Sequence, residues 1–159
     1  MRSYQVFLEM TPERAAQVMS VVMEKSPAVY TQAVAAASAA MNARPKFLMR
    51  QPPEKRADMV RRTLARVRAN VLAEEVLAAY FLEGRKELLI EWLDLVGLEH
   101  EDGVLKDENP GPPPRKRLEE AVASFLRGDG AEDRELLLRA FAAQNAIDWP
   151  DLAATFESS

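Results

Sequence analysis

Residues 85–97 read Arg-Lys-Glu-Leu-Leu-Ile-Glu-Trp-Leu-Asp-Leu-Val-Gly, and this stretch decides the fold class. Beyond its first two residues, the polar side chains reduce to one helical stripe of Glu87, Glu91 and Asp94. A helix that is apolar on its remaining sides belongs in the core of a helical protein. Gly97 suits the position just after the end of such a helix. The stretch therefore predicts an all-α protein with this helix at its centre.

Two other segments resemble the start of this helix. Residues 44–50, 85–91 and 133–139 each place charged or proline residues before an apolar triplet that a charge follows. Such a recurrence is typical of units of two helices. We therefore expect an irregular helical bundle or a short array of degenerate α-hairpins, with about seven helices in all.

Helix starts are marked by prolines, two of which follow a capping residue. Thr11-Pro12 predicts a helix to about residue 25, Ser26-Pro27 predicts one to about residue 42, and Arg44-Pro45 predicts a short one. From Glu54 the apolar spacing predicts a long helix to Gly84, bent near residue 70, with its buried stripe formed by Ala57, Val60, Leu64, Val67 and Val71. The one strand candidate is 4–8.

The chain is expected to form a single domain over residues 1–159. A proline-rich linker at 103–114 separates a core of residues 1–109 from a helical tail at 115–159. The tail predicts three helices, at about 115–127, 131–145 and 149–156. A piece of that size is marginal alone. We expect it to dock on the first part of its own chain or on a partner chain.

Composition narrows the class of protein. The chain has no cysteine, which excludes disulfides and thiolate metal sites. Its N-terminus lacks the apolar core of a signal peptide, and no stretch reaches the ~20 apolar residues that span a bilayer. We expect a cytoplasmic protein with no membrane contact. Abundant alanine, and arginine in excess of lysine, suggest a bacterial source.

The acidic loop 99–108 holds the single histidine, His100. Its acids do not follow the spacing of an EF-hand, and zinc needs more His or Cys ligands than one chain offers. No residue three positions after Glu87 or Glu91 is a histidine, so the di-metal pattern of helical bundles is missing too. We therefore expect no metal ligands, no cofactor and no catalytic residues.

A basic segment offers the other candidate site. Residues 44–68 carry nine Lys or Arg against two acids, although the whole chain has a net charge of −4. On the helix from residue 54, the cations expected to face solvent are Lys55, Arg61, Arg62, Arg66 and Arg68. Such a face can contact phosphates. No aromatic residue interleaves with it, and the acidic chain disfavours nonspecific binding to nucleic acid.

The leading hypothesis is a non-enzymatic interaction or scaffold protein that binds a protein partner or a second copy of itself, as a homodimer. Abundant apolar helix surface and the tail behind its proline linker motivate it. The first alternative is a nucleic-acid-associated protein that uses the basic helix 54–68. The second is an enzyme or metal-binding protein centred on the His100 loop.

Overall fold

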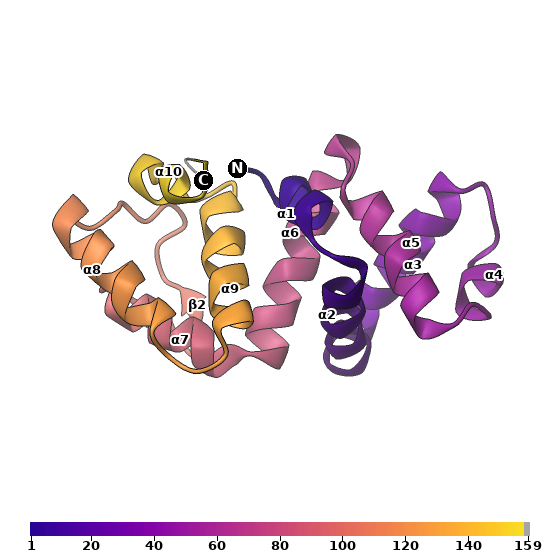
Figure 1. Ribbon diagram of the computed structural model, residues 1–159, viewed down its shortest axis with the longest axis horizontal. Helices are drawn as coiled ribbons and strands as arrows, with labels where there is room; N and C mark the ends of the chain where they lie inside the picture. Colours follow the sequence, from indigo (N-terminus) through magenta and orange to yellow (C-terminus); the bar gives the residue numbers. More distant parts are fainter. Residues whose placement is uncertain (158–159) are drawn as a thin grey trace. The chain divides into compact units, whose positions relative to one another are not determined.

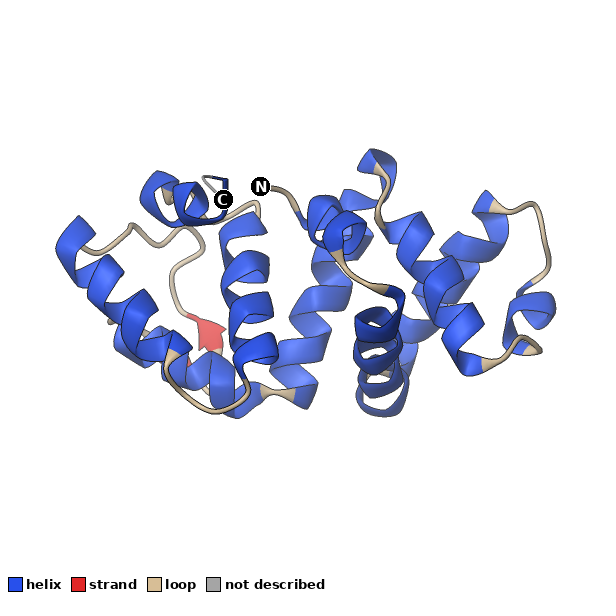
Figure 2. Ribbon diagram, viewed as in Figure 1, coloured by secondary structure: helices blue, strands red, loops and turns tan. Residues whose placement is uncertain are grey.

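The computed structural model describes residues 1–157 and confirms the all-α class (Figures 1 and 2). In this part of the chain the structure has ten α-helices, two short helical turns and one two-stranded hairpin, so the expected count of about seven is low. The chain divides into two compact units. The N-terminal unit is Ser3–Gly84, and the C-terminal unit is residues 85–157 of the described chain with residues 1–2.

The N-terminal unit is built from six α-helices. They are α1 (Ser3–Glu9), α2 (Pro12–Lys25), α3 (Pro27–Ala40), α4 (Pro45–Met49), α5 (Pro53–Leu64) and α6 (Asn70–Ala79), with a 3-10 turn η1 (Val67–Ala69) and a π turn η2 (Tyr80–Gly84). The predicted starts at Pro12, Pro27 and Pro45 are confirmed. At the first of them, the Thr11 hydroxyl accepts the Arg14 N–H at 3.1 Å, which satisfies an otherwise free helix donor.

The strand predicted for residues 4–8 is wrong, because these residues form α1. The side-chain oxygen of Asn70 accepts the backbone N–H of Tyr4 at 3.0 Å, within the first turn of that helix. This long-range bond caps a seven-residue helix that has no capping residue of its own in the sequence before it. Figure 1 shows α1 lying beside α6, against which it packs.

The single long helix predicted from residue 54 to Gly84 is also wrong. α5 ends at Leu64, Arg66 is extended with φ −92° and ψ 143°, and a new helix begins at Asn70. The break changes which side of the chain faces the core. Val67 and Val71, predicted to be buried, are 62% and 73% exposed.

The core of the N-terminal unit lies where α2 and α3 pack on α5, with α1 packed on both α5 and α6. Its fully buried side chains include Phe7, Val18, Leu64 and Tyr80. Ala57, Val60 and Leu64 of the predicted stripe are buried as expected. Periodicity therefore predicted which residues are buried before the break at residue 65, but not which residues are buried after it.

The C-terminal unit consists of α7 (Lys86–Leu95), strands β1 (His100–Glu101) and β2 (Val104–Leu105), α8 (Arg115–Leu126), α9 (Ala131–Ala143) and α10 (Pro150–Glu157). α7 ends at Leu95, and Gly97, with a φ of +73°, lies just after the cap residue Val96 as predicted. The Leu98 N–H reaches the Leu93 carbonyl at 3.0 Å and so closes the helix end. Asp102 and Gly103, both with positive φ, form the two-residue turn between the antiparallel strands.

Aromatic side chains form the centre of the C-terminal unit. Trp92 of α7 is fully buried, 5.5 Å from Phe125 of α8 and 5.8 Å from Phe141 of α9 between ring centroids. Phe141 also contacts Trp149 at 5.1 Å, and the Trp149 indole N–H donates to the Pro110 carbonyl at 2.9 Å. α8 and α9 thus pack on α7, α10 packs on α9, and Trp149 holds the proline-rich segment.

The three similar segments occupy different places in their helices. Residues 44–50 contain all of α4, residues 85–91 begin α7, and residues 133–139 lie inside α9. Their central leucines also differ, since Leu48 is fully buried and Leu89 is partly exposed. A regular repeat places equivalent residues at equivalent positions, so the sequence similarity does not mark one here.

Trp92→Ala is expected to lower the free energy of unfolding of the C-terminal unit by about 3–5 kcal/mol, the usual loss for a large buried aromatic side chain. Urea unfolding followed by Trp149 fluorescence measures this, because both tryptophans lie in that unit. Trp92→Phe is the control. It keeps most of the packing and removes an indole N–H that is buried without a hydrogen-bond partner. A Trp92→Ala protein as stable as the Phe variant would contradict the packing argument.

The position of Trp92 also predicts how fragments behave. A fragment of residues 85–159 should fold and show blue-shifted tryptophan emission, because it keeps α7 between Phe125 and Phe141. A fragment of residues 115–159 lacks that helix, so we expect low helicity and exposed Trp149. Circular dichroism and emission spectra make the comparison. If instead 115–159 folds as well as 85–159, the proline-rich segment is the real boundary between the parts.

Candidate functional site

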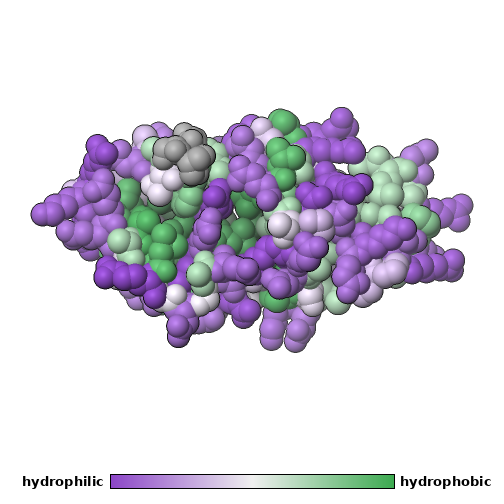
Figure 3. All heavy atoms as spheres, viewed as in Figure 1, coloured by the Kyte–Doolittle hydropathy of each residue, from purple (hydrophilic) through white to green (hydrophobic). Residues whose placement is uncertain are grey.

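The N-terminal unit contains a groove of about 670 Å³. It lies between the second half of α3, the end of α5 with η1, and the start of α6. We call it the alanine groove, and it is lined by Gln32, Ala35, Ala36, Ala39, Ala40, Thr63, Arg66, Arg68, Ala69, Val71, Leu72 and Glu75. Figure 3 shows pale-green, apolar surface over the second half of α3, on the right of the view.

Alanines of α3 form one wall of this groove. The sequence predicts that Ala33, Ala36, Ala37 and Ala40 make one face for close approach of a neighbouring helix. The structure divides that set, with Ala33 and Ala37 fully buried in the unit and Ala36 and Ala40 in the groove wall. A wall of methyl groups allows the backbone of an incoming helix to come close, because the distance between helix axes depends on the side chains at the contact.

Two of the predicted cations lie on the opposite side of the groove. Arg66 and Arg68 are both exposed, and the helix break places them there, Arg66 in the extended connection and Arg68 in η1. Exposed Val71 lies between these cations and Glu75 along the chain. The groove thus combines an apolar lining with two positive charges and one negative charge.

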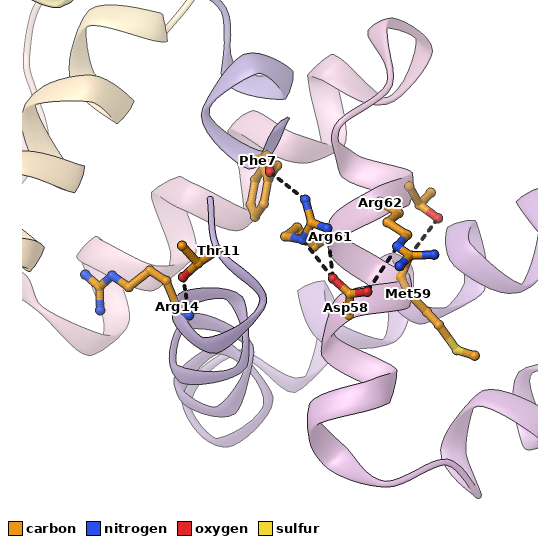
Figure 4. Close-up of polar contacts among 8 residues, drawn as sticks. Phe7, Thr11, Arg14, Asp58, Met59, Arg61 and Arg62 are labelled. Atoms are coloured by element: carbon orange, nitrogen blue, oxygen red, sulfur yellow. Dashed lines mark hydrogen bonds and ion pairs between the residues drawn. The ribbon is translucent and has the colours of Figure 1, made fainter. Parts of the chain in front are cut away.

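The other predicted cations are elsewhere and not all free. Arg61, whose side chain is 15% exposed, pairs with Asp58 at 2.9 Å and donates to the Phe7 carbonyl at 3.4 Å (Figure 4). Arg62 pairs with the same carboxylate at 3.0 Å from an exposed position. Lys55 is exposed near the start of α5. The five cations therefore do not all face solvent in the same way, since Arg61 connects α5 to α1.

The acidic loop places His100 in a structural network. Its Nε2 lies 2.8 Å from an Asp94 oxygen, and its Nδ1 accepts the Gly103 N–H at 3.1 Å. With Nδ1 acting as an acceptor, Nε2 carries the proton and donates to Asp94. Glu91 of the acidic stripe is bound by Arg134. Within residues 1–157, no group of three or more His, Cys, Asp or Glu is arranged to hold a metal ion.

Sequence reasoning missed Ala35, Ala39 and Glu75 as parts of a site. The spacing of Ala35 and Ala39, four residues apart on one helical face, is a signal that could have suggested the first two. The wall across from them could not be anticipated, because it exists only where the chain leaves helical geometry after Leu64.

Comparison with protein-family models, with curated proteins and with solved structures found no match for this chain. No helix among the described residues has the length and apolar character needed to cross a bilayer.

The two arginines that share Asp58 make a matched pair of substitutions. Arg61→Ala should lower the free energy of unfolding by about 1–2 kcal/mol, because it removes charge-assisted bonds that are largely shielded from water. Arg62→Ala should cost about 0.5 kcal/mol or less, since its side chain is 73% exposed. Thermal unfolding followed by circular dichroism gives both values. Equal losses would mean that Arg61 does not hold α1 to α5.

Proposed function

We propose that this protein is a non-enzymatic interaction module whose alanine groove receives an amphipathic helix of a partner protein. The observation that carries the proposal is the apolar groove of about 670 Å³ with Arg66 and Arg68 beside it. Helix-in-groove binding places apolar side chains of a helix in such a hollow. Cations at its edge select and orient the partner by charge.

The chemistry of the groove describes the partner. Its apolar lining is made of alanine methyl groups with Val71 and Leu72, which suits small or medium apolar side chains at helical spacing. Its two arginines favour carboxylates on the flank of the incoming helix, and arginine pairs with carboxylates through two parallel bonds. Glu75 is positioned to favour a basic residue further along that helix. The expected partner segment is therefore amphipathic and mainly acidic.

Two other occupants fit this groove less well. A symmetric contact between two copies would place the same surface of each against the other, so one hollow would face another and neither would be filled. A nucleic acid needs phosphate contacts along its length, whereas apolar residues form most of this groove and Arg61 is engaged with Asp58. The nucleic-acid reading remains an alternative that depends on Lys55, Arg62, Arg66 and Arg68.

The test uses three probes with isotope-labelled protein: a helical acidic amphipathic peptide, the same peptide with lysines in place of its acids, and a short mixed-sequence single-stranded DNA. The acidic peptide should shift the amide signals of α3 and η1, while the lysine peptide should not. Arg66→Glu with Arg68→Glu should exchange the preference of the two peptides, because the sign of the rim charge is reversed.

A filled groove provides the steric control. Ala39→Trp should abolish binding of the acidic peptide, because the indole occupies the space between α3 and η1. Ala28→Trp adds the same side chain to an exposed position of α3 outside the groove and should leave binding unchanged. Tighter binding of DNA than of the acidic peptide would contradict the proposal and favour the nucleic-acid alternative. Concentration-dependent dimerisation that Ala39→Trp prevents would assign the groove to a second copy.

A further inference from the structure

Arg56, in the first turns of α5, is a buried cation with no acidic partner among residues 1–157. It is only 8% exposed, yet no carboxylate of the described residues lies within ion-pair distance of its guanidinium. Arginine stays charged in proteins. Buried charges are normally paired, because removing an ion from water is costly. The unpaired charge of Arg56 therefore needs an explanation.

Most of the guanidinium has a structural role. Its Nη1 donates to the carbonyls of Met49 at 3.1 Å and Gln51 at 3.4 Å, just where α4 ends, and its Nε donates to the Tyr30 hydroxyl at 2.6 Å. The remaining group, Nη2, carries two N–H donors. The structure gives it one contact, the Met23 sulfur at 3.9 Å, and thioether sulfur is a weak acceptor. The end of α4 thus accounts for the hydrogen bonds of Nη1, whereas Nη2 has only the weak contact with Met23.

The Tyr30 hydroxyl, like Nη2, is a donor that lacks a strong acceptor among the described residues. Tyr30 is 7% exposed, and its oxygen accepts the short bond from Arg56 Nε. A hydroxyl also carries one hydrogen to donate. No acceptor for that hydrogen is found among the described residues, so a second buried donor lies beside Nη2. Two unused donors next to a positive charge are the arrangement that binds an oxyanion.

Both side chains line a hollow of about 350 Å³ formed by α2, the start of α3 and the start of α5. Its apolar surface comes from Met19, Met23 and Ala57. The size and the combination of apolar walls with a few convergent polar groups are typical of small-ligand sites. Methionine side chains also adapt to ligands of different shape.

Glu54 limits the charge of the ligand. It is exposed and lines the same hollow, two residues before Arg56. A ligand with two negative charges would meet repulsion from this carboxylate, whereas a ligand with one charge can keep to the side of Arg56 and Tyr30. A monocarboxylate therefore suits the hollow better than a phosphate monoester does.

The geometry points to a binding site for a small monocarboxylate with an apolar body. Its carboxylate accepts hydrogen bonds from Arg56 Nη2 and the Tyr30 hydroxyl, and its apolar part packs against Met19 and Met23. This Arg56 site has no lining residue in common with the alanine groove. Failure of ligand binding at one site would therefore say nothing about binding at the other.

The experiment titrates the full chain with octanoate at neutral pH, and with octanol and octyl phosphate for comparison. The methyl signals of methionine report binding, because Met19 and Met23 line the hollow while Met41 lies outside it. Octanoate should shift the first two and leave Met41 unchanged. Octanol, which lacks the charge, and octyl phosphate, which carries more of it, should each bind at least about tenfold more weakly.

Substitutions separate the polar contacts from the apolar ones. Tyr30→Phe removes one donor and should weaken octanoate binding about tenfold or more, with a smaller effect on octanol. Arg56→Lys keeps a charge and loses the second donor group, so octanoate should lose affinity in a protein that circular dichroism shows to be folded. Arg44→Lys, at an exposed position outside both hollows, is the matched control and should leave octanoate binding unchanged.

Equal affinity for octanoate and octanol in the wild-type protein would overturn the proposal, since the charge would then play no part. Methionine shifts that are the same at Met41 as at Met19 and Met23, or no shift at millimolar octanoate, would overturn it too. The wild-type comparison does not depend on any variant, so a variant that unfolds leaves the test intact.

Discussion

The hydrogen bond from the Tyr4 N–H to the Asn70 side chain is the contact on which the N-terminal unit depends. It joins two positions 66 residues apart. Asn70 reaches the start of α1 from the first turn of α6, which begins after α5 has ended at Leu64. The break therefore lets the Asn70 side chain accept one of the first-turn N–H groups of α1, which a helix does not satisfy internally. A local loss of helical bonds is offset by a long-range capping bond and by the packing of α1 on α6.

Both proposed sites are at the ends of α5. Its first turns carry Arg56, which closes α4 and keeps one donor group for the hollow beside Met23. After its last turn the chain turns outward and presents Arg66 and Arg68 beside the alanine wall. The middle of the helix contributes Val60 and Leu64 to the core. One helix thus fixes the geometry of both hollows, and a change in its length would alter each of them.

Local signals in the sequence predicted the helices that local interactions determine. The starts of α2, α3 and α4 follow from a proline at the first helical position, with the Thr11 cap added at α2, and the end of α7 follows from Gly97. The register of α1 did not follow, because its cap comes from residue 70. The hairpin at 100–105 was missed although its Asp102-Gly103 turn is a recognisable signal.

The candidate sites show the same difference between features set by local sequence and features set by long-range contacts. Charge alone was enough to name Arg66 and Arg68, but the groove beside them depends on a break that periodicity does not encode. Arg56 was left out of the candidate residues. Its spacing could have identified it, since it lies four residues before buried Val60 and therefore on the inner side of the helix. An arginine on the buried face of a predicted helix indicates a polar site, because burial of its charge requires acceptors close by.

Arg134 in α9 has a consequence for how the chain can change over evolutionary time. Its guanidinium donates to the Phe125 and Asp129 carbonyls, binds Glu91 and lies over the Phe125 ring. A methyl group at Gly128 would overlap that guanidinium. A larger residue at position 128 therefore requires the Arg134 guanidinium to move or a shorter side chain at 134, and either change alters these four contacts. The two positions are expected to covary among descendants of this sequence, with glycine favoured at 128 wherever the arginine keeps its contacts.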